Sequence, residues 1–147
     1  MFIFNHRAKL ESASGANFCA LFNPEDNKGV LRINRIQFNA STTVDVQIFS
    51  INTLDLEGMP DASEQIQSFS LDGKLSDALA FGSSWDVKVL DNQLKTCRVF
   101  NGKETTLIYP DEELKIPSGG GILIRVFAYE GQIVGNCSIS FKETTRD

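Results

Sequence analysis

The feature that most constrains this chain is an alternation of apolar and polar residues with a period of two. In the segment VDVQI, Val44, Val46 and Ile48 alternate with Asp45 and Gln47. This pattern is typical of an antiparallel strand that has one buried and one solvated face. The segments WDVKVL and IVGNCSISF repeat the pattern further along the chain. We therefore expect an all-β protein.

One of the expected strands is apolar on both faces. ILIRVFAY, residues 122–129, has two isoleucines and a valine on one face and Leu123, Arg125, Phe127 and Tyr129 on the other. We expect either another sheet or another subunit to cover the second face. Aromatic residues close to an arginine are common anchors at protein interfaces. Arg125, Phe127 and Tyr129 are therefore predicted interface residues.

The segment VLRINRIQFN changes the phase of its alternation halfway along. Leu31 and Ile33 occupy odd positions, whereas Ile36 and Phe38 occupy even positions. An extra residue in one strand of a pair shifts the phase by one, so the sequence predicts a β-bulge near Asn34.

Turn-forming residues predict the structure of two further segments. CRVFNGKETTLIY is predicted to form a hairpin, because Asn101 and Gly102 can supply the two positive φ angles of a type I′ turn. NFCALF, residues 17–22, is an expected strand that ends at the turn cluster NPEDNKG.

The middle of the chain is the one region where short helices are expected. In PDASEQIQSF, Asp61 is followed three residues later by Glu64, which is the spacing of a capping box. KLSDALAFG, which ends in Gly82, is a second candidate for one or two helical turns. Both helices would lie in a connection between strands.

These patterns together predict one domain with seven to nine strands. We expect an antiparallel two-sheet sandwich of jelly-roll type, with one or two short helices in the middle connection. The expected organisation is an extended N-terminal arm over residues 1–16, the sandwich over 17–143 and a C-terminal tail over 144–147. An arm that pairs with a neighbour's sheet edge would place Phe2 and Phe4 in an interface.

The three consecutive glycines of LKIPSGGGILIR could indicate either a phosphate-binding loop or a strand turn. A P-loop requires a Lys-Ser or Lys-Thr pair and a following helix, and neither the pair nor a helical pattern follows Gly121. Gly119, Gly120 and Gly121 are therefore predicted to supply positive φ angles in a turn between strands, after Pro117 ends the preceding strand.

Charge and targeting features exclude several classes of function. The formal net charge is −5, and no basic stripe runs along the sequence, so we expect no binding to nucleic acid. No apolar run reaches the roughly 20 residues of a membrane span, and no signal peptide is recognisable, so we expect no membrane association. Cys19, Cys97 and Cys137 form no CxxC pair and are expected to be reduced and apolar; the alternative is one disulfide with one free thiol.

Catalytic and metal-binding patterns are also missing from the sequence. The single histidine, His6, lies in the expected arm and is interpreted as a solvated side chain. The acidic clusters, including residues 111–113, lack calcium-loop spacing and are interpreted as solvated loop charge. We expect no enzyme activity, no cofactor and no metal.

Two long segments resemble a known group of proteins. The ending YPDEELKIPSGGGILIRVFAYEGQIVGNCSISFKE, residues 109–143, resembles the final strands of small jelly-roll structural proteins of tailed bacteriophages. The segment VLRINRIQFNASTTVDVQIFSI, residues 30–51, is similar to the opening strand pair of such domains.

The resemblance implies a non-enzymatic virion component that is made in the host cytoplasm. It implies a capsid decoration (cement) protein, often a homotrimer bound to the major capsid protein, or a head-fibre or tail-associated module. The alternative is a carbohydrate- or receptor-binding module of a phage tail or fibre, for which exposed aromatics and loop carboxylates would be needed. A glycosidase or cupin-like enzyme of the same architecture is a third possibility, although one histidine is too few for a cupin metal site.

Overall fold

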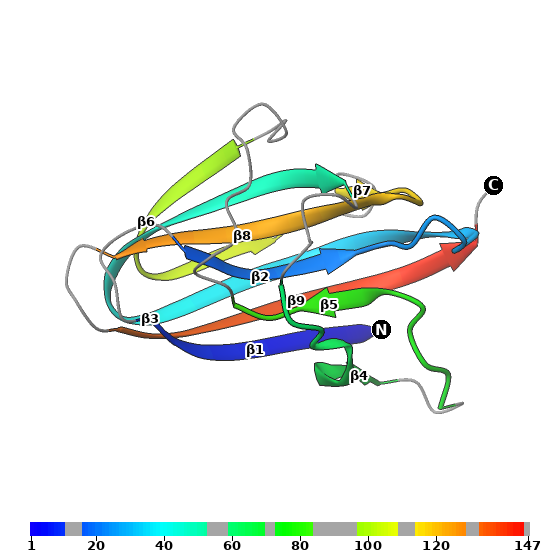
Figure 1. The fold of residues 1–147 in the computed structure, drawn as a ribbon, viewed down its shortest axis with the longest axis horizontal. Helices are drawn as coiled ribbons and strands as arrows, with labels where there is room; N and C mark the ends of the chain where they lie inside the picture. Colours follow the sequence, from blue (N-terminus) through cyan, green and yellow to red (C-terminus); the bar gives the residue numbers. More distant parts are fainter. Residues whose placement is uncertain are drawn as a thin grey trace.

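The protein is all-β in a computed structural model, which describes residues 1–10, 16–52, 59–69, 73–83, 97–108, 114–128 and 133–145 (Figure 1). The strands are β1 (Phe2–Leu10), β2 (Ala16–Phe22), β3 (Gly29–Asn52), β4 (Ile66–Ser68), β5 (Leu79–Phe81), β6 (Cys97–Ile108), β7 (Lys115–Ile116), β8 (Gly120–Ala128) and β9 (Ile133–Thr145). All of their pairings are antiparallel. The prediction of an all-β, antiparallel fold is confirmed.

The long strand β3 organises the sheet because its two halves pair with different neighbours. Its first half pairs with β9 along residues 29–40, and its second half pairs with β8 along residues 44–52. The pairing with β6 continues along both halves, with an irregularity between Asn39 and Val44. In Figure 1, β3 reverses its direction at the left-hand end of the molecule.

Two runs of strands follow from this arrangement. The first run has the order β4-β1-β9-β3 and uses the first half of β3, which also pairs with β7. The second run has the order β3-β8-β2-β5 and uses the second half of β3. Both runs belong to a single sheet.

The sheet is nearly closed into a barrel-like shape, because residues 60–62, which lead into β4 at one edge, pair with β5 at the other edge. Asp61 forms an isolated antiparallel bridge with Phe81. The N–H of Ala62 donates to the carbonyl of Ala80, and the N–H of Gly82 donates to that of Pro60, each at 2.8 Å. These bonds satisfy backbone groups that would otherwise be left at a sheet edge.

The main core lies between the two runs and is rich in phenylalanine. Phe4, Phe38 and Phe141 come from the first run, and Leu21 and Ile124 come from the second; all five are essentially inaccessible to solvent. Burial of such side chains is the main favourable contribution to folding. The inward positions of β3, β8 and β9 are those expected from the alternation in the sequence.

A second, smaller core lies on the other side of β8. It contains Ala20, Phe22, Phe49, Ile51, Met59 and Leu123. Ile122 and Ile124 pack into the main core while Leu123 packs into the second one. On the second face of this strand, Leu123 is buried by residues of the same chain, whereas Arg125 and Phe127 are half-buried.

The predicted bulge is present. The pairing between β3 and β9 shifts between Ile33 and Arg35, so that Ile33 and Ile36 are both buried despite their different parity. A second shift, between Asn17 and Cys19 in β2, was not predicted. It allows Phe18 and Cys19 to be buried next to each other in the main core.

Three local predictions are wrong. Asn101 and Gly102 form no hairpin turn; β6 is continuous through them, because both halves of that strand pair with β3. The segment around Glu64 forms only a three-residue 3-10 turn, η2 (Ser63–Gln65), rather than an α-helix. KLSDALAFG forms no helix over residues 74–82, since its last part is strand β5.

The expected N-terminal arm is also corrected. Residues 2–10 are extended, but they form β1, which pairs with β9 over nine residues and with β4 at its start. At the other end, β9 continues to Thr145, so the expected tail is part of a strand as far as that residue. Both segments are held by backbone hydrogen bonds to neighbouring strands of the sheet.

The glycine-rich turn has a structural explanation, as predicted, although only Gly119 has a positive φ angle, of 81°. Gly121 serves close packing instead, because a Cβ atom there would lie 2.7 Å from the carbonyl oxygen of Leu21. That oxygen belongs to the neighbouring strand and cannot move away easily. The turn thus lets β8 begin in close contact with β2.

Candidate functional site

The predicted interface residues of β8 lie on its outer face and contact other parts of the same chain. The Arg125 guanidinium lies 5.3 Å from the centre of the Phe49 ring, and its Nε donates to Asn17 Oδ1 at 3.3 Å. Phe127 is half-buried opposite Asp45. Tyr129 lies outside the described residues. Arg125 is therefore engaged within the fold.

Phe2 and Phe4 are core residues, and this corrects their expected role in an interface. Their side chains are 6% and 0% exposed, and the Phe2 ring stacks on that of Phe141 with centroids 5.5 Å apart. In this arrangement neither ring is available to a partner, because the arm that was expected to carry them is a strand of the sheet.

His6 is buried, which corrects its interpretation as a solvated side chain. Its Nδ1 is hydrogen-bonded to the Gln65 side chain at 2.9 Å, and its Nε2 donates to Ser83 Oγ at 3.2 Å. The Ser83 hydroxyl is itself a donor to the Phe18 carbonyl, so it must accept from the imidazole. His6 therefore links β1 to Gln65, which lies just before β4, and to Ser83, which lies just after β5.

The outer side of the first run of strands is a regular surface built from side chains of β1, β3, β7 and β9. We call it the polar face and define it by nine outward side chains: Asn5 of β1, Asn136, Ser138, Ser140 and Lys142 of β9, Arg32, Arg35 and Gln37 of β3, and Lys115 of β7. All nine are exposed or half-buried, whereas most of their neighbours along the strands are buried in the core.

The middle of the polar face is made of short, neutral side chains. Asn5, Ser138 and Gln37 lie directly across from one another on three neighbouring strands. Ser138 Oγ donates to Asn5 Oδ1 at 2.9 Å, and Arg35 donates to Gln37 at 2.8 Å. These bonds hold the side chains close to the sheet.

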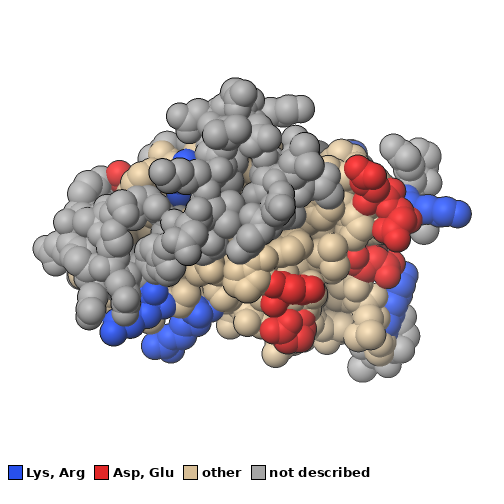
Figure 2. Space-filling model, in the orientation of Figure 1, with Lys and Arg blue, Asp and Glu red and all other residues tan. Residues whose placement is uncertain are grey.

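One end of the polar face carries four cations. In the strand register, Arg32 lies opposite Lys142 of β9 on one side and opposite Lys115 of β7 on the other. Arg35 follows just after the bulge in β3. We call Lys115, Arg32 and Lys142 the cationic row. None of the nine side chains of the polar face is acidic. Figure 2 shows acidic and basic side chains next to one another at the right-hand end of the molecule, in the view that it gives.

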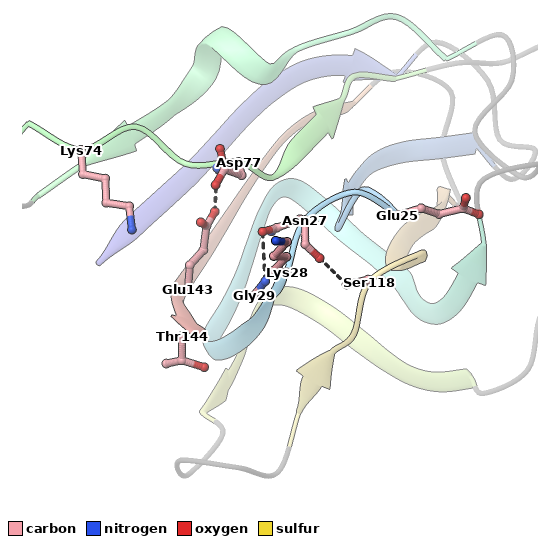
Figure 3. Close-up of a pocket in the computed structure, with 9 residues that line it drawn as sticks. All are labelled: Glu25, Asn27, Lys28, Gly29, Lys74, Asp77, Ser118, Glu143 and Thr144. Atoms are coloured by element: carbon pink, nitrogen blue, oxygen red, sulfur yellow. Dashed lines mark hydrogen bonds between the residues drawn. The ribbon is translucent and has the colours of Figure 1, made fainter. Parts of the chain in front are cut away.

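A pocket of about 730 Å³ opens at the same end of the molecule (Figure 3). It is lined by Glu25, Asn27, Lys28, Gly29, Lys74, Asp77, Ser118, Glu143 and Thr144. These residues come from the loop before β3, the glycine-rich turn, the end of β9 and the segment 73–78. The mixed charge and the many amide and hydroxyl groups suit a polar, neutral ligand.

Buried hydrogen bonds fix the walls of this pocket. The fully buried Asn23 side chain donates to the carbonyls of Gly29 and Ile116, each at 3.0 Å, and accepts from Asn27. Ser118 Oγ donates to the Asn27 carbonyl, a bond drawn in Figure 3. Asn23 thereby joins the loop before β3 to the glycine-rich turn.

Glu143 anchors the segment 73–78 across the end of the sheet. Its Oε1 accepts bonds from Ser76 Oγ, from the N–H of Asp77 at 3.0 Å and from the N–H of Ala78 at 3.2 Å. This carboxylate is therefore occupied by the chain itself and is not a candidate general base.

The cysteines give no sign of a redox or metal centre. Cys19 and Cys137 are free and buried in the main core, and the side chain of Cys97 lies outside the described residues. Burial raises the pKa of the Cys19 thiol well above 9.0, and a hydrogen bond with Cys137 raises it further. Within the described ranges, no three His, Cys, Asp or Glu side chains are placed to hold a metal ion.

The polar face was missed in the sequence because its members are far apart in the chain. Arg32, Lys115 and Lys142 each follow an apolar residue in a strand, which indicates an outward position, but only strand register brings them together. No helix in the described part of the chain is long and apolar enough to cross a membrane. In comparisons with known proteins, no family model matches the chain, and no curated protein or solved structure matches it significantly.

Proposed function

We propose that the chain is a non-enzymatic structural protein of a bacteriophage virion, most simply a capsid decoration or cement protein, that attaches through its polar face. The observation that carries the proposal is the polar face itself. It is exposed or half-buried and held by the sheet, and it combines neutral hydrogen-bonding side chains with cations at one end. A rigid surface of this kind suits contact with a second protein, because little side-chain entropy is lost on binding.

We further propose that the fold is a jelly-roll sandwich. The support is the pairing order, in which β1, β9, β3 and β6 are neighbours in one run and β2, β8, β3 and β6 are neighbours in the other. The strands β3 and β6 each pass from one run to the other at the same end of the molecule. Jelly rolls are common in viral capsid proteins, which agrees with the resemblance of residues 30–51 and 109–143 to phage structural proteins. This part of the argument is an analogy of fold.

The partners in this proposal are the major capsid protein or another virion protein, together with further copies of the chain, as in a trimer. Attachment places the protein in the virion after its synthesis in the host cytoplasm.

Replacing Ser138 by tryptophan tests the proposed attachment. The new side chain would stand up from the middle of the polar face, so we expect occupancy of the particles by the purified variant to fall at least about tenfold. Thr43→Trp is the control, because Thr43 is exposed at the bend of β3 and away from this face. Occupancy is measured by quantitative mass spectrometry of virions that were stripped of the protein and then incubated with each variant.

Equal occupancy by the Ser138→Trp and Thr43→Trp proteins would contradict attachment through this face. Absence of the wild-type chain from purified virions would contradict the proposed function as a whole. Circular dichroism of both variants establishes that each is folded before the comparison is made.

A second candidate function is the binding of a carbohydrate or receptor, and the end pocket is the observation that favours it. Its volume of about 730 Å³ and its amide, hydroxyl and carboxylate groups could hold a sugar. No aromatic side chain is among the residues that line it, so the usual stacking platform is missing from the described site. Binding to a glycan array that is abolished by Asn27→Ala, with no attachment to capsids, would favour this function over the first.

A further inference from the structure

Two of the three cysteines face one another across the main core. Cys19 comes from β2 in the second run of strands and Cys137 from β9 in the first run, and both are 0% exposed. Their thiols are hydrogen-bonded to each other. In the order of the described strands, β2 lies between β8 and β5, whereas β9 lies between β1 and β3. The contact therefore joins the two runs through the core and not along the sheet.

The packing around the two thiols also brings their strands together. Cys137 lies opposite His6 of β1 and Phe38 of β3 in the strand register. The ring of Phe18, the residue before Cys19, has its centroid 5.5 Å from that of His6 and 5.0 Å from that of Phe38. The register shift in β2 allows Phe18 and Cys19 to point into the core together. The residue next to Cys19 therefore contacts the residues on both sides of Cys137.

We propose that Cys19 and Cys137 form a disulfide under oxidising conditions and so cross-link the two runs of strands through the main core. Both are free thiols in the structure. A reducing cytoplasm keeps such thiols reduced, whereas disulfides form and persist outside the cell. The inference goes beyond the proposed function and does not depend on it. In a virion, the thiols would be reduced during assembly in the host and oxidised after release.

The oxidant in this step is a small-molecule disulfide such as oxidised glutathione. One protein thiol loses its proton, and its thiolate attacks the small disulfide, so that a mixed disulfide forms and one glutathione thiolate leaves. The second protein thiolate then attacks the protein sulfur of the mixed disulfide, which forms the Cys19–Cys137 bond and releases the second glutathione. The two protein thiols lose two electrons, the small disulfide gains them, and the two protons end on the released glutathione thiolates.

Burial makes this exchange slow in the folded protein. Neither cysteine is accessible to solvent, and burial holds the pKa of the Cys19 thiol well above its usual range, so that little thiolate is present. Exchange therefore requires opening of the sheet, and the same barrier protects the disulfide from reductants once it has formed. The pair is thus suited to a structural cross-link and not to catalytic redox turnover.

The cross-link would stabilise the fold because it closes a long loop. Cys19 and Cys137 enclose roughly 120 residues, and a disulfide removes more conformational freedom from the unfolded chain as the loop becomes longer. We expect the oxidised protein to have a Tm about 5–15 °C higher than that of the reduced protein. Thermal unfolding followed by circular dichroism measures this difference.

Refolding under controlled redox conditions tests the inference. The purified chain is unfolded in urea and diluted into a buffer of oxidised and reduced glutathione, so that burial cannot prevent the exchange. Free thiols are then alkylated in denaturant, and the peptides are identified by mass spectrometry. We expect a linked peptide that contains Cys19 and Cys137, with Cys97 alkylated. Folded protein that receives the same buffer should form the same link at least about tenfold more slowly.

Cys137→Ala and Cys97→Ser are the matched controls, and each is compared with itself, oxidised against reduced. Oxidation should leave the Tm of Cys137→Ala unchanged, because the proposed bond cannot form. It should raise the Tm of Cys97→Ser as much as that of the wild type. Cys97→Ser retains only Cys19 and Cys137, so it tests the pair even if Cys137→Ala does not fold.

Three outcomes would overturn the inference. They are alkylation of all three cysteines after oxidative refolding, a disulfide that involves Cys97, and a Tm that falls on oxidation. These results are separate from the proposed function, because the experiment uses the purified chain alone. Absence of the chain from virions would refute the proposed function and leave the cross-link in place, whereas failure of the disulfide to form would leave attachment through the polar face in place.

Discussion

Deletion of residues 1–10 is expected to abolish cooperative folding. The deletion removes β1, and with it Phe2, Phe4 and His6 from the closed side of the barrel. It also leaves the nine-residue edge of β9 unpaired and exposes the main core to water. The measurement is urea denaturation followed by circular dichroism, and we expect the truncated chain to show no cooperative transition.

The control for this deletion keeps the strand and changes only its outward side chains. Asn5, Arg7 and Lys9 are exposed, so replacing all three by alanine should alter the free energy of unfolding by only about 0.5 kcal/mol for each residue. A truncated protein that unfolds cooperatively at the wild-type urea concentration would contradict the account. It would restore the interpretation of the first residues as a separate arm.

Phe18→Ala is expected to lower the free energy of unfolding by about 3–5 kcal/mol, a large effect for a single substitution. The Phe18 ring is inaccessible to solvent, and its centroid lies 5.0 Å from that of Phe38 and 5.5 Å from that of His6. The rings of Phe18 and Phe38 also pack over Gly135, where a Cβ atom would lie 2.9 Å from each of them. The substitution would leave a cavity that these neighbours cannot fill.

Phe69→Ala is the matched control for this effect. The same atoms are removed, but Phe69 is 62% exposed, so we expect a change within about 0.5 kcal/mol. Both values come from urea denaturation under the same conditions. Similar losses for the two variants would show that Phe18 is not at the centre of the core.

Local alternation predicted the fold where each strand has one clear apolar face. The inward residues of β3, β8 and β9 follow directly from it, and so does the bulge between Ile33 and Arg35. The same signal was present in FIFNHRAKL, where Phe2, Phe4, His6 and Ala8 share a face. His6 hid the pattern, because a histidine on an apolar face is buried only if its nitrogens find partners, and those partners are 59 and 77 residues away.

The features that sequence reasoning missed depend on contacts between distant segments. Asn101-Gly102 has a strong local preference for a turn, yet pairing of β6 with both halves of β3 overrides it. The cationic row depends on register in the same way, since its three residues are brought together only by the pairing of β3 with β7 and β9. Such pairings contribute nothing to the local pattern from which strands are recognised.

The central claim is that the protein works through its polar face and not through the end pocket. Zero-length carbodiimide cross-linking of assembled virions tests it most directly, because this reagent joins an amine to a carboxylate only where the two groups are in contact. We predict that mass spectrometry will find Lys115 and Lys142 joined to acidic residues of another virion protein. Cross-links to another protein that arise from Lys28 and Lys74 at the pocket, with none from Lys115 or Lys142, would contradict the claim.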